Sequence, residues 1–173
     1  PDVLEAYPFP FHLDYTVRLR EGRLETRFTV TNRGTEEMPM GFGMHPWFPL
    51  PLAPDGSREQ CRVQAPVSKV WELDDLLPTG RMSDPPPERD IQTERILGDL
   101  FFDDVYTGVT EEGWWEATYF DPAAQIEVAV ASDGAMREFV LYTAPDRPVI
   151  CLEPYSCTTN AANLQAQGID AFA

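Results

Sequence analysis

The sequence is short of basic residues. Its 173 residues include 13 Lys and Arg against 29 Asp and Glu, which gives a formal net charge of −16 at pH 7. Binding of nucleic acid or of an anionic membrane surface depends on clustered Lys and Arg. We therefore expect no nucleic acid and no membrane among the partners, whereas a small neutral ligand is indifferent to this charge.

Cysteines and long apolar runs are also scarce. The three cysteines, Cys61, Cys151 and Cys157, show no CxxC spacing, so they indicate neither a disulfide framework nor a zinc site. The sequence has no metal-ligand motif and no glycine-rich phosphate loop, and we expect no metal and no cofactor. No apolar run approaches the roughly 20 residues of a membrane-spanning helix. These absences favour a cytoplasmic location, where thiols stay reduced.

Proline and glycine are frequent, with 17 and 11 residues, and they separate many short apolar runs. This pattern is typical of strands rather than helices. Residues 13–32 give the cleanest signal, because apolar and polar residues alternate on both sides of Glu21-Gly22, as in a hairpin with one buried and one wet face. With 43% apolar residues, the chain can bury one sizeable core, and we expect a single domain over residues 1–173.

The rest of the chain reads as strands separated by turns. We expect a strand over residues 61–73 that Pro66 interrupts, a turn at 77–80, and one short helix within 91–100. Four further strands are expected in the last third, over residues 114–120, 125–131, 138–143 and 149–152. The last of them is continuously apolar, which predicts a strand buried on both faces.

Residues 41–50 form the most unusual segment. His45 stands between a glycine-rich approach and Pro46, and two aromatic residues, Trp47 and Phe48, follow at once. Pro46 restricts the preceding residue to extended backbone, so the imidazole of His45 is aimed by the main chain as well as by packing. Two interpretations stay open, a core histidine beside a hydrophobic cluster and a histidine placed for chemistry.

Carboxylates stand at two further points of interest. Glu153 ends the buried strand, and an unpaired charge in a low dielectric costs several kcal/mol, so this side chain must be paired, hydrogen-bonded or functional. The polar loop 158–163 could supply hydrogen-bonding groups near it. Asp103 and Asp104 follow two aromatic residues, and such a pair can equally be a turn, a cap or part of a site.

Four motifs together resemble the aldose 1-epimerase (galactose mutarotase) family. Each is weak alone, but they occur in the order and at roughly the separations seen in that family, and they extend over nearly the whole chain: Phe42–Phe48, Leu77–Gly80, Phe102–Tyr106 and Cys151–Tyr155. The resemblance implies an all-β fold, a galactose-mutarotase-like antiparallel β-sandwich whose concave face binds a sugar.

The resemblance also implies a reaction and a role for each residue. Interconversion of α and β hexose anomers needs one group that takes the proton of the C1 hydroxyl and another that gives a proton to the ring oxygen. By similarity, Glu153 is the base and His45 the acid. Asp103 matches the family's aspartate and accepts hydrogen bonds from sugar hydroxyls, while Trp47 or Phe48 offers an apolar face to the pyranose.

The sequence departs from the family pattern in several places. Pro49 stands where asparagine is usual, and Trp47 where tyrosine is usual. The family's chains are longer, and their N-terminal part carries an arginine and an Asn-x-His-Gly segment that are absent here; His12 lacks that context and is expected to be structural. We therefore expect a C-terminal part of the sandwich, with N-terminal strands missing, that self-associates or pairs with the missing portion through uncovered edges.

Two alternative functions stay open beside the catalytic epimerase. A non-catalytic carbohydrate-binding or regulatory relative would bind sugar on the same face without using Glu153 as a base. A sugar-phosphate 1-epimerase, of the type that acts on glucose 6-phosphate, would need clustered arginines, and only Arg137 and Arg147 lie close in sequence to the late strands.

Overall fold

The computed structural model describes residues 3–172, and the chain divides into two compact units, one up to Met40 and one from Gly41 onward. Each unit is described by itself, and the single-domain arrangement over residues 1–173 stays a prediction. No helix within residues 3–172 is both long and apolar enough to cross a membrane.

The first unit holds a short helix, α1 (Val3–Ala6), and an antiparallel hairpin of β1 (Phe11–Arg20) and β2 (Arg23–Asn32). The predicted hairpin is confirmed. Glu21 and Gly22 both have positive φ, 49° and 77°, as a two-residue hairpin turn requires. The register pairs Leu13 with Val30 and Leu19 with Leu24, and the rings of the paired Tyr15 and Phe28 stack 4.6 Å apart.

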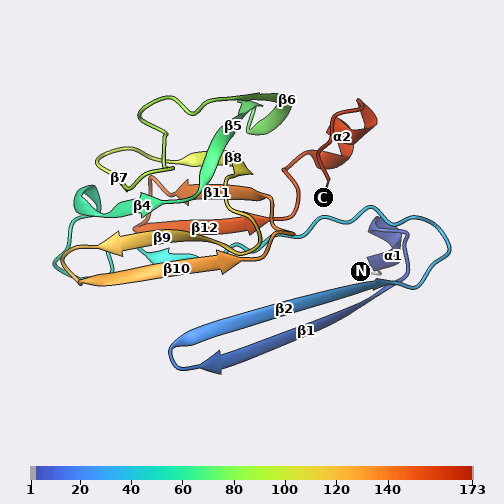
Figure 1. Cartoon of the computed structure of the whole chain (residues 1–173), viewed down its shortest axis with the longest axis horizontal. Helices are drawn as coiled ribbons and strands as arrows, with labels where there is room; N and C mark the ends of the chain where they lie inside the picture. The colour runs from blue at the N-terminus through green and yellow to red at the C-terminus, as the bar shows by residue number, and fades with distance from the viewer. Residues whose placement is uncertain (1–2, 173) are drawn as a thin grey trace. The chain divides into compact units, whose positions relative to one another are not determined.

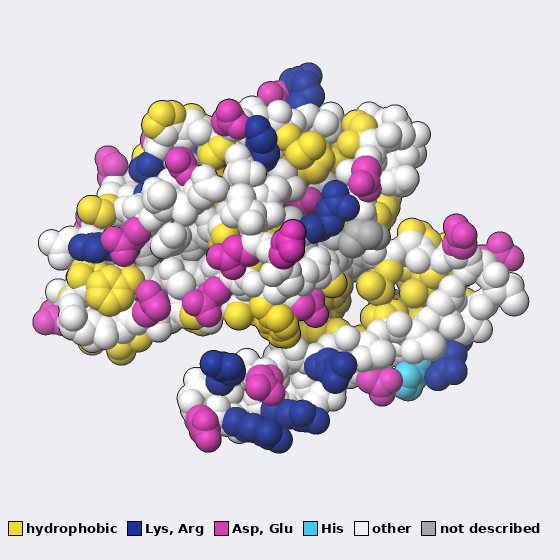
Figure 2. All heavy atoms as spheres, in the orientation of Figure 1, with side chains coloured by type: hydrophobic (Ala, Val, Ile, Leu, Met, Phe, Trp, Pro, Cys, Tyr) yellow, Lys and Arg dark blue, Asp and Glu magenta, His cyan; other side chains and the backbone are white. Residues whose placement is uncertain are grey.

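The prediction that one face of the hairpin is buried is wrong for this unit. The apolar side of β1 is not buried within it, because every residue of the strand is exposed, Leu19 by 76%. Polar residues occupy the other side by alternation, and Figure 2 shows Lys and Arg side chains gathered on this part of the chain. A two-stranded ribbon has only one neighbour for each strand, so it cannot bury a face without a third element.

The second unit is an antiparallel β-sandwich, as the family resemblance implied (Figure 1). Its larger sheet has six strands in the order β3 (Trp47–Pro49), β12 (Val149–Tyr155), β11 (Glu138–Thr143), β8 (Asp103–Val109), β5 (Val67–Asp74) and β6 (Leu77–Ser83). Its smaller sheet has four, in the order β10 (Ile126–Ser132), β9 (Trp115–Asp121), β4 (Arg62–Gln64) and β7 (Arg95–Ile96). A 3-10 turn, η1 (Arg58–Gln60), precedes β4.

The main core lies between these two sheets. It joins buried side chains of the smaller sheet, such as Tyr119, to those of the larger sheet, such as Leu141 and Leu152. Full burial of each aliphatic side chain contributes about 1.5–3 kcal/mol. The interruption predicted at Pro66 is confirmed, because it separates β4 in one sheet from β5 in the other.

The outer face of the larger sheet carries a second, smaller core. Trp71, Val105 and Val140 pack there against Leu164 of helix α2 (Ala161–Ala166). The predicted late strands are confirmed, and β12 is buried on both faces because Leu152 meets the main core while Glu153 faces the outer side. The larger sheet therefore has one side closed by the sandwich and the other only partly covered.

Two local predictions are wrong. The segment 91–100 forms no helix; it consists of the two-residue strand β7, paired to β4, between bends and a turn, with Ile91 and Leu97 fully buried. Burial of these two side chains in the sandwich outweighs local helix propensity. The turn expected at 77–80 lies two residues earlier, at Asp75 and Leu76, whose φ values are 47° and 65°, and residues 77–80 begin β6.

Candidate functional site

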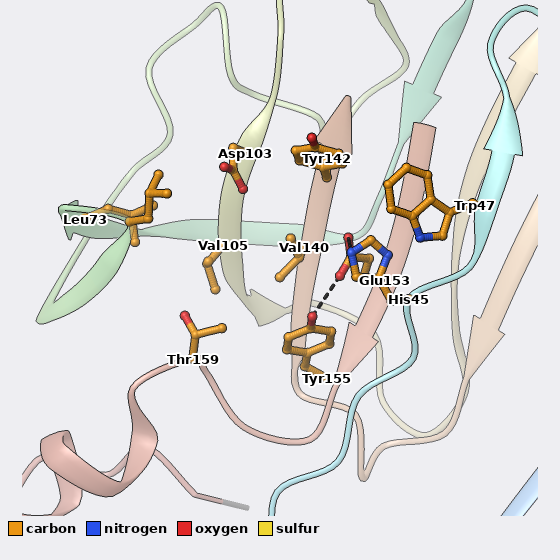
Figure 3. Close-up of a pocket in the computed structure, with 11 residues that line it drawn as sticks. His45, Trp47, Leu73, Asp103, Val105, Val140, Tyr142, Glu153, Tyr155 and Thr159 are labelled. Atoms are coloured by element: carbon orange, nitrogen blue, oxygen red, sulfur yellow. Dashed lines mark hydrogen bonds and ion pairs between the residues drawn. The ribbon is translucent and has the colours of Figure 1, made fainter. Parts of the chain in front are cut away.

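A pocket of about 300 Å³ opens on the outer face of the larger sheet (Figure 3). Its walls come from β5, β8, β11 and β12, from β3 with the segment before it, and from the loops that follow β5 and β12. The polar lining consists of His45, Asp103, Tyr142, Glu153, Tyr155 and Thr159. The other side chains in the lining are Trp47, Leu73, Leu76, Val105 and Val140.

Glu153 provides the buried carboxylate of this pocket. Its side chain is 2% exposed, and its Oε2 accepts a hydrogen bond of 2.8 Å from the Tyr155 hydroxyl. Both side chains leave β12 on the same face because they are two residues apart in a strand. Burial raises the pKa of the Glu153 carboxyl above its ordinary value; the Tyr155 hydrogen bond and His45 act against this rise, and Asp103 adds to it.

His45 lies next to Glu153 because backbone hydrogen bonds join its segment to β12. Gly43 forms a bridge to Tyr155, and the Met44 N–H donates to the Pro154 carbonyl at 3.1 Å. The imidazole stacks on Trp47, with 5.2 Å between ring centroids and 6° between planes. Its Nε2 lies 3.4 Å from Oε1 of Glu153. The ring is about half exposed, so it contacts both the buried acid and the pocket space.

The two adjacent aspartates face different surroundings. Asp103 begins β8 opposite Tyr142 of β11 and lines the pocket. Asp104 points elsewhere and accepts a hydrogen bond of 3.1 Å from Arg89. Burial raises the pKa of the Asp104 carboxyl, and Arg89 opposes that rise. The pair is part of a strand rather than a turn, and strand alternation leaves only Asp103 in the site.

The two aromatic residues after Pro46 are also separated by alternation. Trp47 lines the pocket, about half exposed, and the Arg147 guanidinium lies 5.6 Å from the centre of its ring. Phe48 packs against the main core and is not among the side chains that line the pocket. The structure thus brings His45, Trp47, Asp103 and Glu153 together and places Phe48 on the other face.

Two polar residues of the pocket, Tyr142 and Tyr155, were not singled out from the sequence. Tyr155 follows Glu153 by two, so strand alternation could have indicated it. Tyr142 comes from β11, and only the tertiary fold brings it here; Thr159 lies in the loop 158–163, which the sequence had suggested as a source of hydrogen-bonding groups near Glu153. The Thr159 hydroxyl oxygen is buried, and no described residue hydrogen-bonds to it. It is a free hydrogen-bonding group on the lining.

A possible set of metal ligands overlaps this site. Ligand atoms of His45, Cys151 and Glu153 lie within 4.8 Å of one another. Burial, followed by the nearby charge of Glu153, raises the pKa of the Cys151 thiol to about 12. The thiol therefore stays protonated, and only a thiolate is a good ligand. The chemistry of these donors fits an acid–base pair better than a metal centre.

Comparisons with known proteins agree with this architecture. The sequence profile of the aldose 1-epimerase family matches residues 1–170. The uncharacterized protein YihR of Escherichia coli K12 is 26% identical over 170 residues, which are 95% of this chain and 52% of YihR. The chain thus spans about half the length of this relative.

Solved structures show the same fold. A galactose mutarotase-like protein from Clostridium acetobutylicum superposes with a TM-score of 0.81 at 22% identity, over 94% of this chain and 51% of that one. A galactose mutarotase related enzyme from Lactobacillus acidophilus gives 0.76 at 21% identity, over 89% and 52%. The fold and the family profile lead to one conclusion: the chain belongs to the aldose 1-epimerase family.

Proposed function

We propose that this chain carries the acid–base site of a mutarotase that interconverts the α and β anomers of a neutral aldose. The observation that carries the proposal is the contact of 3.4 Å between His45 Nε2 and Glu153 Oε1 at the wall of a pocket of about 300 Å³. Ring opening requires a proton acceptor and a proton donor on one sugar, and this pair supplies one of each.

In the proposed reaction, Glu153 takes the proton of the C1 hydroxyl while His45 gives a proton to the ring oxygen. The C1–O5 bond breaks, C1 rotates, and the ring closes on the other face with the proton transfers reversed. Burial suits Glu153 to the role of base, because a carboxylate with a raised pKa holds a proton more strongly. His45 suits the acid role because its half-exposed ring faces both Glu153 and the pocket space, where the ring oxygen of the sugar would lie.

The other lining residues fit sugar recognition. Asp103 can accept hydrogen bonds from hydroxyl groups, and Trp47 presents an aromatic surface to the C–H face of a pyranose. Phe48 packs in the core, so we assign the aromatic contribution to Trp47 alone.

The charge of the lining favours a neutral sugar over a sugar phosphate. Among the described residues that line the pocket, none is Lys or Arg, and two are carboxylates. A phosphate placed there would be repelled and would lack the paired donors that it needs. Arg147 lies beside Trp47, but it is engaged by Asp146 at 3.3 Å.

Polarimetry on freshly dissolved α-glucose and α-galactose tests the proposal. We expect the protein to accelerate mutarotation without added metal or nucleotide. Glu153→Gln should reduce turnover by about 10²–10⁴-fold with little change in sugar affinity, and His45→Asn should also reduce it. Glu127→Gln, at an exposed position of β10, and His12→Asn are matched controls that should retain activity.

Two outcomes would overturn the proposal. Full turnover in Glu153→Gln would exclude this carboxylate as the base. Rates equal to buffer across a panel of aldoses, with sugar binding detected by calorimetry, would support the non-catalytic binding protein instead.

A further inference from the structure

The two oxygens of Glu153 have different partners. Oε1 lies 3.4 Å from His45 Nε2, and Oε2 accepts a hydrogen bond of 2.8 Å from the Tyr155 hydroxyl (Figure 3). A carboxylate rotates readily about its last bond, which would exchange these oxygens in the absence of a fixed partner. The Tyr155 hydrogen bond provides that partner from a side chain on the same strand.

The ring of Tyr155 is itself fixed by the His45 segment. Gly43 bridges to Tyr155, and a Cβ at position 43 would lie 2.6 and 2.7 Å from two carbons of the tyrosine ring. Only a residue without a side chain leaves room for this approach. Residue 43 is also two positions before His45, so one short segment carries the histidine and supports the tyrosine.

We propose that Tyr155 is a positioning residue that holds Oε2 of Glu153 and leaves Oε1 as the atom that exchanges protons with the sugar. The inference rests on the proposed mutarotase function, but the hydrogen bond can be measured without turnover. Tyr155 need not touch the reacting atoms, because it acts through the carboxylate.

The groups around Glu153 determine the direction in which its pKa should change when the Tyr155 hydroxyl is removed. Four groups face the carboxyl: His45, Asp103, Cys151 and Tyr155. A hydrogen bond to a carboxylate favours its charged form. Removal of the Tyr155 hydroxyl should therefore raise the pKa of Glu153 further, which moves the acid limb of the activity profile to higher pH.

Tyr155→Phe tests the inference because it removes the hydroxyl and keeps the ring. Loss of a hydrogen bond to a charged group and of carboxylate alignment should lower kcat by about 10–100-fold, with a much smaller change in KM. Tyr142→Phe is the matched control; Tyr142 lines the same pocket, and in the described chain its hydroxyl makes no hydrogen bond to Glu153. The acid limb of the pH profile of Tyr142→Phe should lie at the same pH as that of the wild type.

Carbon NMR of the glutamate carboxyls separates this inference from the function proposal. The Glu153 signal, assigned with Glu153→Gln, should titrate at higher pH in Tyr155→Phe than in wild type, whether or not the protein turns over sugar. Absence of mutarotation would reject the function alone. An unchanged Glu153 titration would reject the role of Tyr155.

A second variant protects the test against loss of folding. Fluorotyrosine at position 155 keeps the ring and makes the hydroxyl a stronger donor, so the Glu153 titration should move to lower pH. Opposite shifts in the two variants support the inference, and a shift to higher pH with fluorotyrosine, or none, contradicts it.

Discussion

Gly43→Ala should damage both stability and turnover, although it adds a single methyl group. The new Cβ would lie 2.6, 2.7 and 3.0 Å from three atoms of the Tyr155 ring, whereas carbon atoms in contact prefer about 3.5–4.0 Å. The ring or the segment must therefore move by about 1 Å. Overpacking of this kind lowers the free energy of unfolding by about 1–3 kcal/mol. Alanine also reduces the conformational entropy of the unfolded chain, which offsets about 0.4–1 kcal/mol of this loss. A 1 Å displacement at the site costs roughly 10²-fold in rate.

Urea unfolding and polarimetry on the same preparations measure the two effects. Gly134→Ala is the control, because an added Cβ there would come no closer than 3.3 Å to a neighbour. In a double-mutant cycle, Gly43→Ala should cost little stability in a Tyr155→Ala background, since alanine has none of the three clashing ring atoms. If Gly43→Ala unfolds at the wild-type urea concentration and keeps full turnover, the packing argument is wrong. An equal cost in both backgrounds would place the clash elsewhere.

Three further outcomes follow from the structure. Asp103→Asn should move the acid limb of the pH profile to lower pH, because Asp103 raises the pKa of Glu153; a limb that stays in place would contradict the coupling. Asp121→Asn should destabilise the fold by about 2–4 kcal/mol, since Oδ1 and Oδ2 accept backbone N–H groups of residues 52, 53, 123 and 124, and two of these donors would be orphaned. Burial raises the pKa of Asp121, but these hydrogen bonds together outweigh it and hold the pKa below its ordinary value. The advantage of Asp121 over Asn should therefore be full above about pH 4 and shrink as acid protonates the carboxyl, which unfolding curves at several pH values would reveal. Light scattering on residues 1–173 should show self-association through the exposed apolar side of β1, relieved by Leu19→Lys; a monomeric wild-type chain would refute this.

Alternation of apolar and polar residues was the basis of most of the predicted strands. It indicated the hairpin of residues 13–32 and the strands of the last third, and the apolar run before Glu153 indicated a strand buried on both faces, which is β12. The family motifs then selected His45, Asp103 and Glu153, which the structure brings to one pocket. Their roles in a reaction stay predictions.

The remaining features depend on contacts that a single sequence does not encode locally. Adjacent residues in a strand face opposite sides, so Trp47 and Phe48 could not both enter the pocket, but the sequence did not indicate which one would. Ile91 and Leu97 are six residues apart, about 120° around a helix, so a helix would not bury both on one face, whereas the bends and the short strand here place both in the core. Thr159 reaches the lining through the turn after β12, which tertiary packing places.

The pairing of β3 with β12 has a consequence for synthesis. These are the first and last strands of the second unit, and among the described strands β3 pairs with β12 alone. Because the chain leaves the ribosome from its N-terminus, β3 must wait unpaired until nearly the whole unit has emerged. A chain that stops before Val149 loses the partner of β3 and Glu153 together. Only chains that were translated through β12 therefore contain both His45 and Glu153 of the pocket.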